Sequence, residues 1–505
     1  MLAEAIAIIF LTYLVVNFLT TRKQLKQMAT HFVGPKPHPV WGNVHLFAYQ
    51  DVPGMFETLV GFHTLFGKDV ITWGPLNLTM LNLTSAENVE KVIMAKKTKK
   101  SFIYDFVRPW LGDGLLISSG EKWFQRRKII TPTFHFNILE NFVNVFNKES
   151  DIMVEVLKKH VDGSEFDIYN YVTLMALDSI CETSMGTAVD AQKNPQNKYV
   201  QNVKRMSVLI LLQTVSFLSG FPLLYALFHP KGWEQRGIVK QLHQFTDSII
   251  EQRRTQLERE QSKQIDFNKD EENLYAKRKM TFLDLLLNVR VEGKPLSNLD
   301  IREEVDTFMF EGHDTTTSGI SFAIYQLALN QSIQDRVYDE VVKILGPNPL
   351  SKNLTHQELQ DFRYLEAVIK ESMRLFPPVP LIGRQLVEDL EMNGTTLKAG
   401  QDILIPIYVI HRNPEVFPDP ERFDPERFTE AAESNRGPYD YIPFSAGSRN
   451  CIGQRYAMLE MKVTLIKLIA AYKILPGESL RQLRVKTDLV LRPDEGIPVK
   501  IVLRQ

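Results

Sequence analysis

Cysteine is scarce in this chain, which has only Cys181 and Cys451 among its 505 residues. Two cysteines are too few for the disulfide framework of a small secreted protein, and their scarcity fits a reducing compartment. Net charge is lacking as well, because 59 lysines and arginines are balanced by 60 aspartates and glutamates. A chain without an overall positive field has little attraction for nucleic acid, so we expect no nucleic-acid partner.

The sequence also lacks a glycine-rich loop between a strand and a helix, the usual cradle for a nicotinamide or flavin cofactor. Its composition is that of a globular protein, 44% hydrophobic and 24% charged, and the chain is long enough to enclose a cofactor. Helical periodicity dominates, and strand signals are confined to a minor part of the chain. The predicted fold class is therefore mainly α with a small antiparallel β part.

The N-terminal segment is almost uncharged, since Glu4 is the only charged residue between Leu2 and Thr21. At about 1.5 Å per residue this run can cross a bilayer, and we predict a membrane anchor over residues 1–21. Basic residues follow the run, so the positive-inside rule predicts a single crossing with the body of the chain in the cytosol. A cleaved signal peptide is the alternative, but it would carry basic residues before a shorter apolar core.

Residues 22–45 are basic and rich in proline, and we predict that they link the anchor to one large domain over residues 46–505. Three prolines between Gly34 and Pro39 fix φ and forbid a helix, which predicts a stiff connector. A second uncharged stretch, Ser207 to Phe228, is interrupted by glycine and proline. This pattern favours an amphiphilic flap on the bilayer surface over a second crossing.

Two local signals predict elements in the second half of the chain. Thr355 and Glu358 have the spacing of a capping box before a helix that Pro377 and Pro378 would end. The pair Asn393-Gly394 lies between β-branched residues and predicts a hairpin. The charged run from 251 to 279 is typical of a long solvated helix that ends in a loop.

The segment around Cys451 is the most informative part of the sequence. A thiolate bound to haem iron needs backbone N–H groups directed at the sulfur, and Gly447 and Gly453 allow a tight turn and a close approach. Arg449 offers positive charge to a haem propionate, and the helical pattern after Gly453 places the sulfur near a helix N-terminus, which favours the thiolate. The alternative is a buried cysteine in a glycine-containing turn, which is also how we interpret Cys181.

This segment resembles the haem-binding signature of the cytochrome P-450 superfamily, Phe-x-x-Gly-x-Arg-x-Cys-x-Gly, and matches it at every defined position, beginning with Phe444. The resemblance implies a single cytochrome P-450-type domain that encloses haem b, with Cys451 as the axial ligand of the iron. In that family the thiolate donates electron density to the iron and favours O–O cleavage. The implied function is a monooxygenase that hydroxylates a hydrophobic substrate with O2.

Two further pairs resemble this family. Glu371 and Arg374 match its Glu-x-x-Arg pair, and the resemblance implies that Arg427 completes a buried charge network that holds the segment leading to Cys451. Trp123 and Arg127 lie four residues apart, so one helix face can present both to a haem propionate, as the family's Trp-x-x-x-Arg does. A surface ion pair and a surface cation–π pair are the alternatives. Arg384 is the candidate for the second propionate.

The run from Phe308 to Thr317 combines a glycine with three consecutive threonines, which is unfavourable for helix formation alone. Reduction of dioxygen needs two protons, which a hydroxyl can relay and an acid can supply. Asp314 and Thr315 resemble the family's acid and alcohol at the oxygen-binding kink, and are the predicted catalytic residues. The alternative is a polar helix face whose threonines bond back to the preceding turn. We interpret His313 as structural.

Glu311 stands where the superfamily usually has a small residue, and the run from Glu311 to Thr316 resembles the fourth P-450 family, the fatty-acid ω-hydroxylase branch. In many members of that branch this glutamate forms an ester with a haem methyl group. The resemblance implies terminal hydroxylation of fatty acids or related lipids, with xenobiotics as another substrate class. A tethered haem would restrict the geometry in favour of the stronger primary C–H bond. We expect Phe310, Val379 and Leu381 to line the channel.

The resemblance also implies partners and a location. Electrons would come from a membrane-bound NADPH-dependent flavoprotein reductase, with cytochrome b5 as a second donor, at the endoplasmic reticulum membrane. Five basic residues are candidates for a docking face, although scattered solvated charge is an equally good interpretation: Arg126, Lys128, Arg455, Lys462 and Lys467. With a cytosolic body we expect no glycan on the four Asn-x-Thr sequons, which begin at Asn77, Asn82, Asn353 and Asn393.

Two other functions would keep the Cys451 loop. A haem-thiolate isomerase or dehydratase would rearrange an oxidised substrate without dioxygen or a reductase. A non-enzymatic haem carrier or gas sensor would leave a proton-relay pair unused. The pair Asp314 and Thr315 therefore favours the monooxygenase, while the sequence leaves the choice among fatty acids, eicosanoid-like lipids, terpenoid hormones and xenobiotics open.

Overall fold

The protein is represented by a computed structural model, which describes residues 29–95, 98–134, 136–216, 218, 221–265, 280–478, 480 and 483–504, with scattered positions between 12 and 26. Most of the predicted anchor over residues 1–21, and the loop expected near 279, lie outside the described residues. Among the residues that are described, no helix is both long and apolar enough to cross a bilayer.

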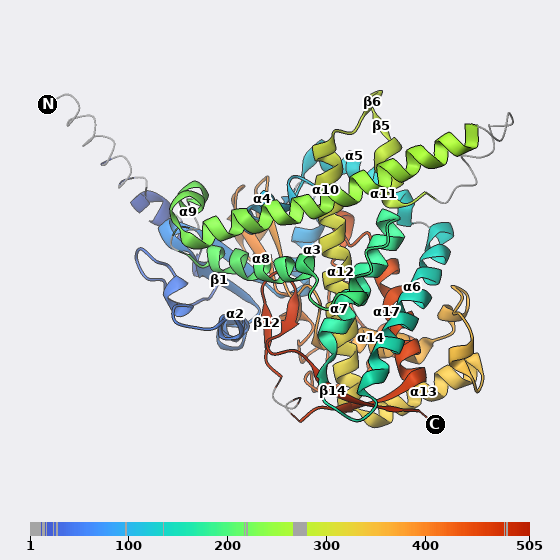
Figure 1. Cartoon of the computed structure of the whole chain (residues 1–505). Coiled ribbons are helices and arrows are strands. Elements are labelled where there is room, and N and C mark those ends of the chain that lie inside the picture. Colours follow the sequence, from blue (N-terminus) through green and yellow to red (C-terminus); the bar gives the residue numbers. More distant parts are fainter. Residues whose placement is uncertain are drawn as a thin grey trace.

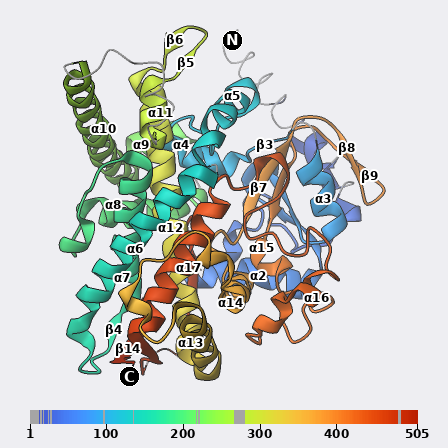
Figure 2. The same cartoon turned by 90° about the vertical axis from the view of Figure 1, so that its right-hand side faces the viewer.

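Helices make up most of the described structure, as the sequence predicts. They gather on one side of the molecule, and most strands lie with shorter helices on the other side (Figures 1 and 2). In chain order the helices are α2 Val52–Phe66, α3 Ala86–Met94, α4 Arg108–Leu111, α5 Gly120–Ile130, α6 Phe136–Leu157, α7 Ile168–Ile180, α8 Lys198–Thr214, α9 Pro222–Phe228, α10 Pro230–Ile265, α11 Phe282–Asn288, α12 Asn298–Leu329, α13 Gln331–Leu345, α14 Arg363–Leu375, α15 Ile407–Ile410, α16 Glu430–Glu433 and α17 Gln454–Ala471.

Helix α12 runs through the centre of the helical side, where it packs against α7, α14, α17 and α10 (Figure 1). Ser297 caps its N-terminus by accepting a hydrogen bond from the backbone N–H of Asp300 at 3.1 Å. The helix is continuous through the three threonines that are unfavourable by propensity alone, because most of its side chains are buried against neighbouring helices. Tertiary packing thus fixes the element that carries the predicted catalytic pair.

The largest sheet has five strands in the order β1-β2-β10-β7-β3, and all its pairings are antiparallel except that of β10 with β2. Its strands are β1 Asp69–Trp73, β2 Thr79–Leu83, β3 Thr98–Lys99, β7 Ile382–Leu386 and β10 Asp402–Ile405. The smaller sheets are formed by β4 Phe166–Asp167, β5 Arg290–Val291, β6 Lys294–Pro295, β8 Leu390–Met392, β9 Thr395–Leu397, β11 Tyr472–Pro476, β12 Val485–Thr487, β13 Leu491–Pro493 and β14 Pro498–Leu503. This agrees with the predicted minor antiparallel part.

Both local sequence signals are present, but one of them belongs to a different element. Asn393 and Gly394 join β8 to β9 with positive φ angles of 50° and 75°, so the hairpin prediction is confirmed. Thr355 and Glu358 form the predicted reciprocal hydrogen bonds. They cap only the 3-10 turn Glu358–Gln360, and α14 begins later at Arg363. The predicted helix start was therefore wrong by several residues.

The proline-rich segment before the body packs on the large sheet. Phe32 is buried, Val33 forms a bridge with Val70 of β1, and Gly34 lies against the backbone of Ile71 so closely that a Cβ would clash. Asn43 is buried as well and accepts a hydrogen bond from the backbone N–H of Trp73 at 2.8 Å. These contacts fix the direction in which the chain leaves the body toward its N-terminus.

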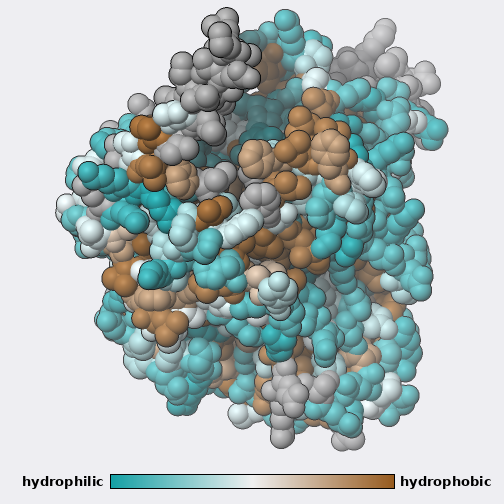
Figure 3. Space-filling model, turned by 90° about the vertical axis from the view of Figure 1, so that its left-hand side faces the viewer, coloured by the Kyte–Doolittle hydropathy of each residue, from teal (hydrophilic) through white to brown (hydrophobic). Residues whose placement is uncertain are grey.

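The uncharged stretch from 207 to 228 contributes the end of α8 and the short helix α9, which begins at Pro222. Large hydrophobic side chains are exposed here, and Figure 3 shows hydrophobic residues gathered in the upper part of the face on which α9 lies. The exposed residues are Phe221, Leu223, Leu224, Leu227, Phe228 and Trp233. A patch of exposed hydrophobic side chains indicates contact with an apolar partner or a lipid surface.

Candidate active site

An internal cavity of about 540 Å³ lies between α12 and the loop that carries Cys451. Its wall is mostly apolar, and it includes Phe310, Val379 and Leu381, as predicted for the substrate channel. Eight of the predicted site residues also line it: Trp123, Arg127, Glu311, Thr315, Phe444, Arg449, Cys451 and Gly453. Three others, Asp314, Arg384 and Gly447, are not among the residues that line it.

The Cys451 loop is held by its own backbone. The N–H of Cys451 donates to the carbonyl of Phe444 at 2.9 Å, and Gly453 is the N-cap residue of α17. Gly447 has a φ of +68°, and a Cβ there would lie 2.9 Å from the side chain of Ile93, so both conformation and space require glycine. The accessible surface of Cys451 faces the cavity, while Cys181 is buried at the end of α7 as expected.

In the protein without haem, burial has the largest effect on the pKa of the Cys451 thiol. It raises the pKa to about 11, and the charge of Glu311 acts in the same direction. The N–H of Gly453 and the guanidinium of Arg127 lower the pKa, but they do not outweigh burial. The N–H at the helix N-terminus thus acts in the predicted direction, toward the thiolate, but burial outweighs it in the protein alone, and the charge of a bound metal would stabilise the thiolate further.

Three arginines surround one side of the cavity. Arg127 donates to the backbone oxygen and the side-chain oxygen of Asn450, both at 2.9 Å, and so joins α5 to the Cys451 loop. The guanidinium of Arg449 lies 4.1 Å from the ring centroid of Trp123, and its Nη1 is buried without a hydrogen-bond partner among the described residues. Burial and the neighbouring charges of Arg384 and Arg127 lower the pKa of Arg449 to about 10.

Sequence reasoning missed a fourth cation, Lys100, which lines the same cavity. Its ammonium lies 4.5 Å from the ring centroid of Tyr104, and burial together with Arg384 lowers its pKa well below the usual value. Lys100 follows the two-residue strand β3 and stands in no motif, so only its basic character could have marked it. These four cations, of which Arg384 is buried and the others half-buried, outnumber the two carboxylates that line the cavity, Glu311 and Asp488, and Asp488 is already paired with Arg492. The excess of positive charge fits the two propionates of a haem.

Glu311 and Thr315 face the cavity from successive turns of α12. The hydroxyl of Thr315 donates to the backbone carbonyl of Glu311 at 2.7 Å, and Thr316 donates to the carbonyl of Gly312 at 2.8 Å. These bonds are the alternative that the sequence left open, although Thr315 still lines the cavity. Burial raises the pKa of Glu311 to about 7, and Lys100 acts in the opposite direction.

Asp314 points away from the cavity. Its carboxylate forms a buried ion pair with Arg492, whose Nε lies 3.2 Å from Asp488. A proton transfer that uses Asp314 therefore requires this ion pair to open. His313 bonds through Nδ1 to the carbonyl of Met309 at 2.6 Å, and burial lowers its pKa, which fits the structural role that we predicted.

A second charge network lies on α14. Glu371 accepts two hydrogen bonds from Arg374 at 2.7 and 2.9 Å, and both side chains are fully buried. Arg427 lies 3.6 Å from the same carboxylate, as predicted, and the N–H of Asp424 donates to it at 2.8 Å. Burial still raises the pKa of Glu371, which shows how much the desolvation of this carboxylate costs. Arg374 also donates to the carbonyls of His411 and Arg422 and so holds the segment that precedes the Cys451 loop.

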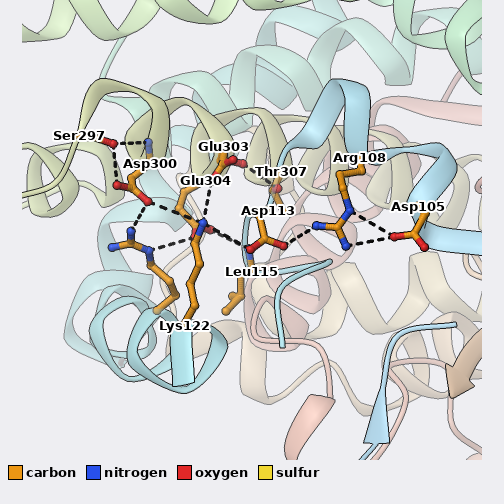
Figure 4. A network of polar contacts seen from close by, with 11 residues as sticks. Asp105, Arg108, Asp113, Leu115, Lys122, Ser297, Asp300, Glu303, Glu304 and Thr307 are labelled. Atoms are coloured by element: carbon orange, nitrogen blue, oxygen red, sulfur yellow. Dashed lines mark hydrogen bonds and ion pairs between the residues drawn. The ribbon is translucent and has the colours of Figure 1, made fainter. Parts of the chain in front are cut away.

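Ion pairs also attach α5 to the start of α12 (Figure 4). Arg126 lies 2.6 Å from Asp300, Lys122 lies 2.9 Å from Glu303, and Glu304 accepts a hydrogen bond from the N–H of Leu115 at 3.0 Å. Since α5 carries Trp123 and Arg127, this network positions both residues at the cavity.

The predicted basic docking face is only partly accessible. Arg126 is buried and pairs with Asp300, Lys462 is buried in an ion pair with Glu366, and Lys467 is buried beside Asp151. These three residues were wrongly included because their partners come from distant parts of the sequence. Lys128 and Arg455 are exposed and remain candidates.

A comparison with known families agrees with this site. The family model described as Cytochrome P450 matches residues 33–501. The chain belongs to the cytochrome P450 family. It is 41% identical over 468 residues to "Cytochrome P450 4d2" of Drosophila melanogaster, with 92% of each chain covered. It is 43% identical over 427 residues to "Cytochrome P450 4V2" of Homo sapiens, covering 84% of this chain and 80% of the relative.

Membership of the cytochrome P450 family makes the chain a monooxygenase that binds haem through a cysteine thiolate. The fit is supported by an accessible cysteine that faces an apolar cavity with an excess of cations on one side. The isomerase and the haem carrier are accordingly set aside.

Proposed function

We propose that this cytochrome P450 is a membrane-bound ω-hydroxylase of fatty acids or related lipids. The observation that carries the proposal is a carboxyl group, Glu311, on the wall of the apolar cavity that Cys451 also faces. An apolar wall suits an acyl chain, and a carboxyl beside the haem site offers a group for covalent attachment.

The residues at the cavity have separate roles in this proposal. Cys451 would bind the haem iron through its sulfur, and Arg127, Arg384, Arg449 and Trp123 would hold the propionates. Bound haem supplies the activation of dioxygen. The protein supplies an apolar enclosure that excludes water and orients the chain terminus of the substrate.

Thr315 is the proposed proton-holding group. Its Oγ1 donates to the carbonyl of Glu311 at 2.7 Å and lines the cavity, so a rotation about χ1 would turn the proton toward the substrate side. Asp314, the proposed acid, is buried beside Arg492 and would have to leave this pair and take up a proton from solvent before it could pass one on.

Glu311 is proposed to tether the haem as an ester. Denaturing chromatography of the wild-type protein should then show haem that stays with the polypeptide. Glu311→Ala should release it, and Glu311→Gln, which keeps the volume but lacks the acid, should release it as well. Release of haem from the wild-type protein under the same conditions would rule out the tether.

The proposed setting is the endoplasmic reticulum membrane, with residues 1–21 as anchor, 22–45 as linker and 46–505 as a cytosolic catalytic domain. The exposed hydrophobic residues around α9 support a surface that rests on lipid. Electrons are proposed to come from an NADPH-dependent flavoprotein reductase, with cytochrome b5 as a second donor. Glycans on Asn77 or Asn353 would contradict the cytosolic placement.

The test is a reconstitution of the full chain with reductase, NADPH and a panel of lipids that contains saturated fatty acids, eicosanoids, terpenoids and xenobiotics. We expect oxygen-dependent hydroxylation at the terminal carbon of at least one fatty acid. Hydroxylation only at internal carbons, or turnover of xenobiotics alone, would contradict the proposal.

A further inference from the structure

A second cavity, of about 800 Å³, lies outside the active site between α8, α9, α10 and the segment Phe102–Leu111, which comprises the 3-10 helix η4 Phe102–Phe106 and α4. No residue lines both cavities. The size falls within the range of about 300–1,000 Å³ that is usual for small-molecule sites.

The two cavities lie on opposite faces of one wall. Ile103 and Tyr104 line the active-site cavity, whereas Phe102 and Phe106 line the second cavity. Helix α8 alternates in the same way, with Ile210, Leu211 and Thr214 on the active-site face and Met206 and Gln213 on the other. The second cavity is therefore a separate site that touches the active site only through this wall.

The lining of the second cavity is amphipathic. Apolar residues, among them Phe106, Met206 and Val239, form most of its surface, and Pro222 and Ala226 connect it to the exposed apolar helix α9. An acyl chain can enter such a cavity from a lipid surface without crossing water.

The basic residues that line this cavity outnumber the acidic ones. Arg302 pairs with Asp247 at 3.3 Å, and Asp105 pairs with Arg108 at 3.1 Å. Arg236 and Lys240 stand one turn apart on α10, and neither has an ion pair with a described residue. Two cations beside an apolar cavity are complementary to a ligand with an acyl chain and an anionic head.

We propose that this cavity is a peripheral site for an amphipathic anion, an acyl chain that ends in a carboxylate or a phosphate. Arg236 and Lys240 bind the anionic head, and the apolar lining buries the chain. The site is independent of the reaction at the haem, so it can be occupied whether or not the ligand is a substrate.

The test is photoaffinity labelling of the haem-loaded full chain in nanodiscs of phosphatidylcholine. The probe is palmitic acid with a diazirine in its chain, and labelled peptides are mapped by mass spectrometry. We expect labelled peptides from α9 and α10 in addition to any from the active-site cavity. Labels confined to residues that line the active-site cavity would overturn the proposal.

Matched variants test separately how the cavity binds the anionic head of the ligand and how it buries the acyl chain. The double variant Arg236→Glu with Lys240→Glu should reduce labelling of α9 and α10 at least tenfold, and Arg259→Glu, an exposed cation further along α10, should leave it unchanged. Ala226→Trp keeps both cations but fills the cavity, and should reduce the same labels. Labelling of the active-site cavity, or a wild-type haem spectrum, reports that each variant is folded. Undiminished labels in the double variant would contradict the proposal.

Competitors identify the source of the ligand. Displacement of the probe by palmitate or by phosphatidic acid would support the site and distinguish a free fatty acid from a lipid headgroup. Equal displacement by the uncharged methyl ester of palmitic acid would overturn the recognition of the anion.

Discussion

The protein has two groups of arginines in its interior, and they differ in whether a carboxylate pairs with their charge. Arg374 of α14 and Arg427 share the carboxylate of Glu371, and two backbone carbonyls accept further hydrogen bonds from the guanidinium of Arg374. At the cavity, Arg449 has a buried Nη1 without a partner, and Arg384 and Lys100 add further charge. Paired charges hold the fold together, whereas the unmatched charges mark where an anionic ligand belongs.

Breaking the paired group should have the largest effect. Glu371→Ala leaves two buried guanidiniums without their carboxylate and should lower the free energy of unfolding by about 3–5 kcal/mol, with loss of haem incorporation. Urea unfolding and the haem absorbance of the purified variant measure both. The control is Glu433→Ala, which removes the partially exposed partner of Lys370 and should cost less than about 1 kcal/mol. A Glu371→Ala protein with wild-type stability and haem content would contradict the role of the pair.

Removing an unmatched charge should have the opposite effect on the protein without haem. Arg449→Leu should leave the thermal midpoint of the apoprotein unchanged or raised, because this half-buried cation has no ion pair with a described residue to lose and leucine can still pack on Trp123. Its haem affinity should fall by about tenfold or more, which corresponds to about 1.4 kcal/mol. Arg374→Leu is the matched variant and should destabilise the apoprotein. If Arg449→Leu lowered the apoprotein midpoint as much as Arg374→Leu, the two groups would not differ.

The sequence predicted most of the cavity because its motifs report on local chemistry. The spacing around Cys451, the pair on α5 and the run on α12 all lead to residues that line one cavity or stand beside it. Contacts between distant segments could not be predicted in the same way. Arg492 lies 178 residues from Asp314, and its ion pair turns the predicted acid away from the cavity. Likewise, Lys462 and Lys467 had the composition of a docking face but are buried against acids on other elements.

The fold was predictable in class but less so at element boundaries. Helical periodicity and the Asn393-Gly394 turn correctly indicated a helical protein with small sheets. The capping box at Thr355 was identified correctly but assigned to α14, since the side-chain spacing alone does not show whether a short 3-10 turn or an α-helix follows.

A buried acid that has no cationic partner among the described residues extends the comparison, and at mildly acidic pH it should give the smallest effect. Glu460 of α17 is fully buried, and its burial raises the pKa to about 8. The unfolded chain ionises at lower pH than the folded protein, so this group reduces stability as pH rises from about 5 to 8. Glu460→Gln should therefore gain stability relative to the wild type as the pH rises from about 5 to 8.

Thermal unfolding at pH 5.5 and pH 8.5 measures this difference between Glu460→Gln and the wild type. The exposed Glu430→Gln is the control and should track the wild type at both values. A constant difference across this range would mean that Glu460 does not titrate as its burial requires.

The most direct test of the central claim, that Cys451 binds the haem iron as a thiolate, is the absorption spectrum of the ferrous carbon monoxide complex. The folded wild-type protein should show the strongly red-shifted Soret band that an axial thiolate produces, and Cys451→His should lose that shift while still binding haem. A wild-type complex without the red-shifted band would contradict the account.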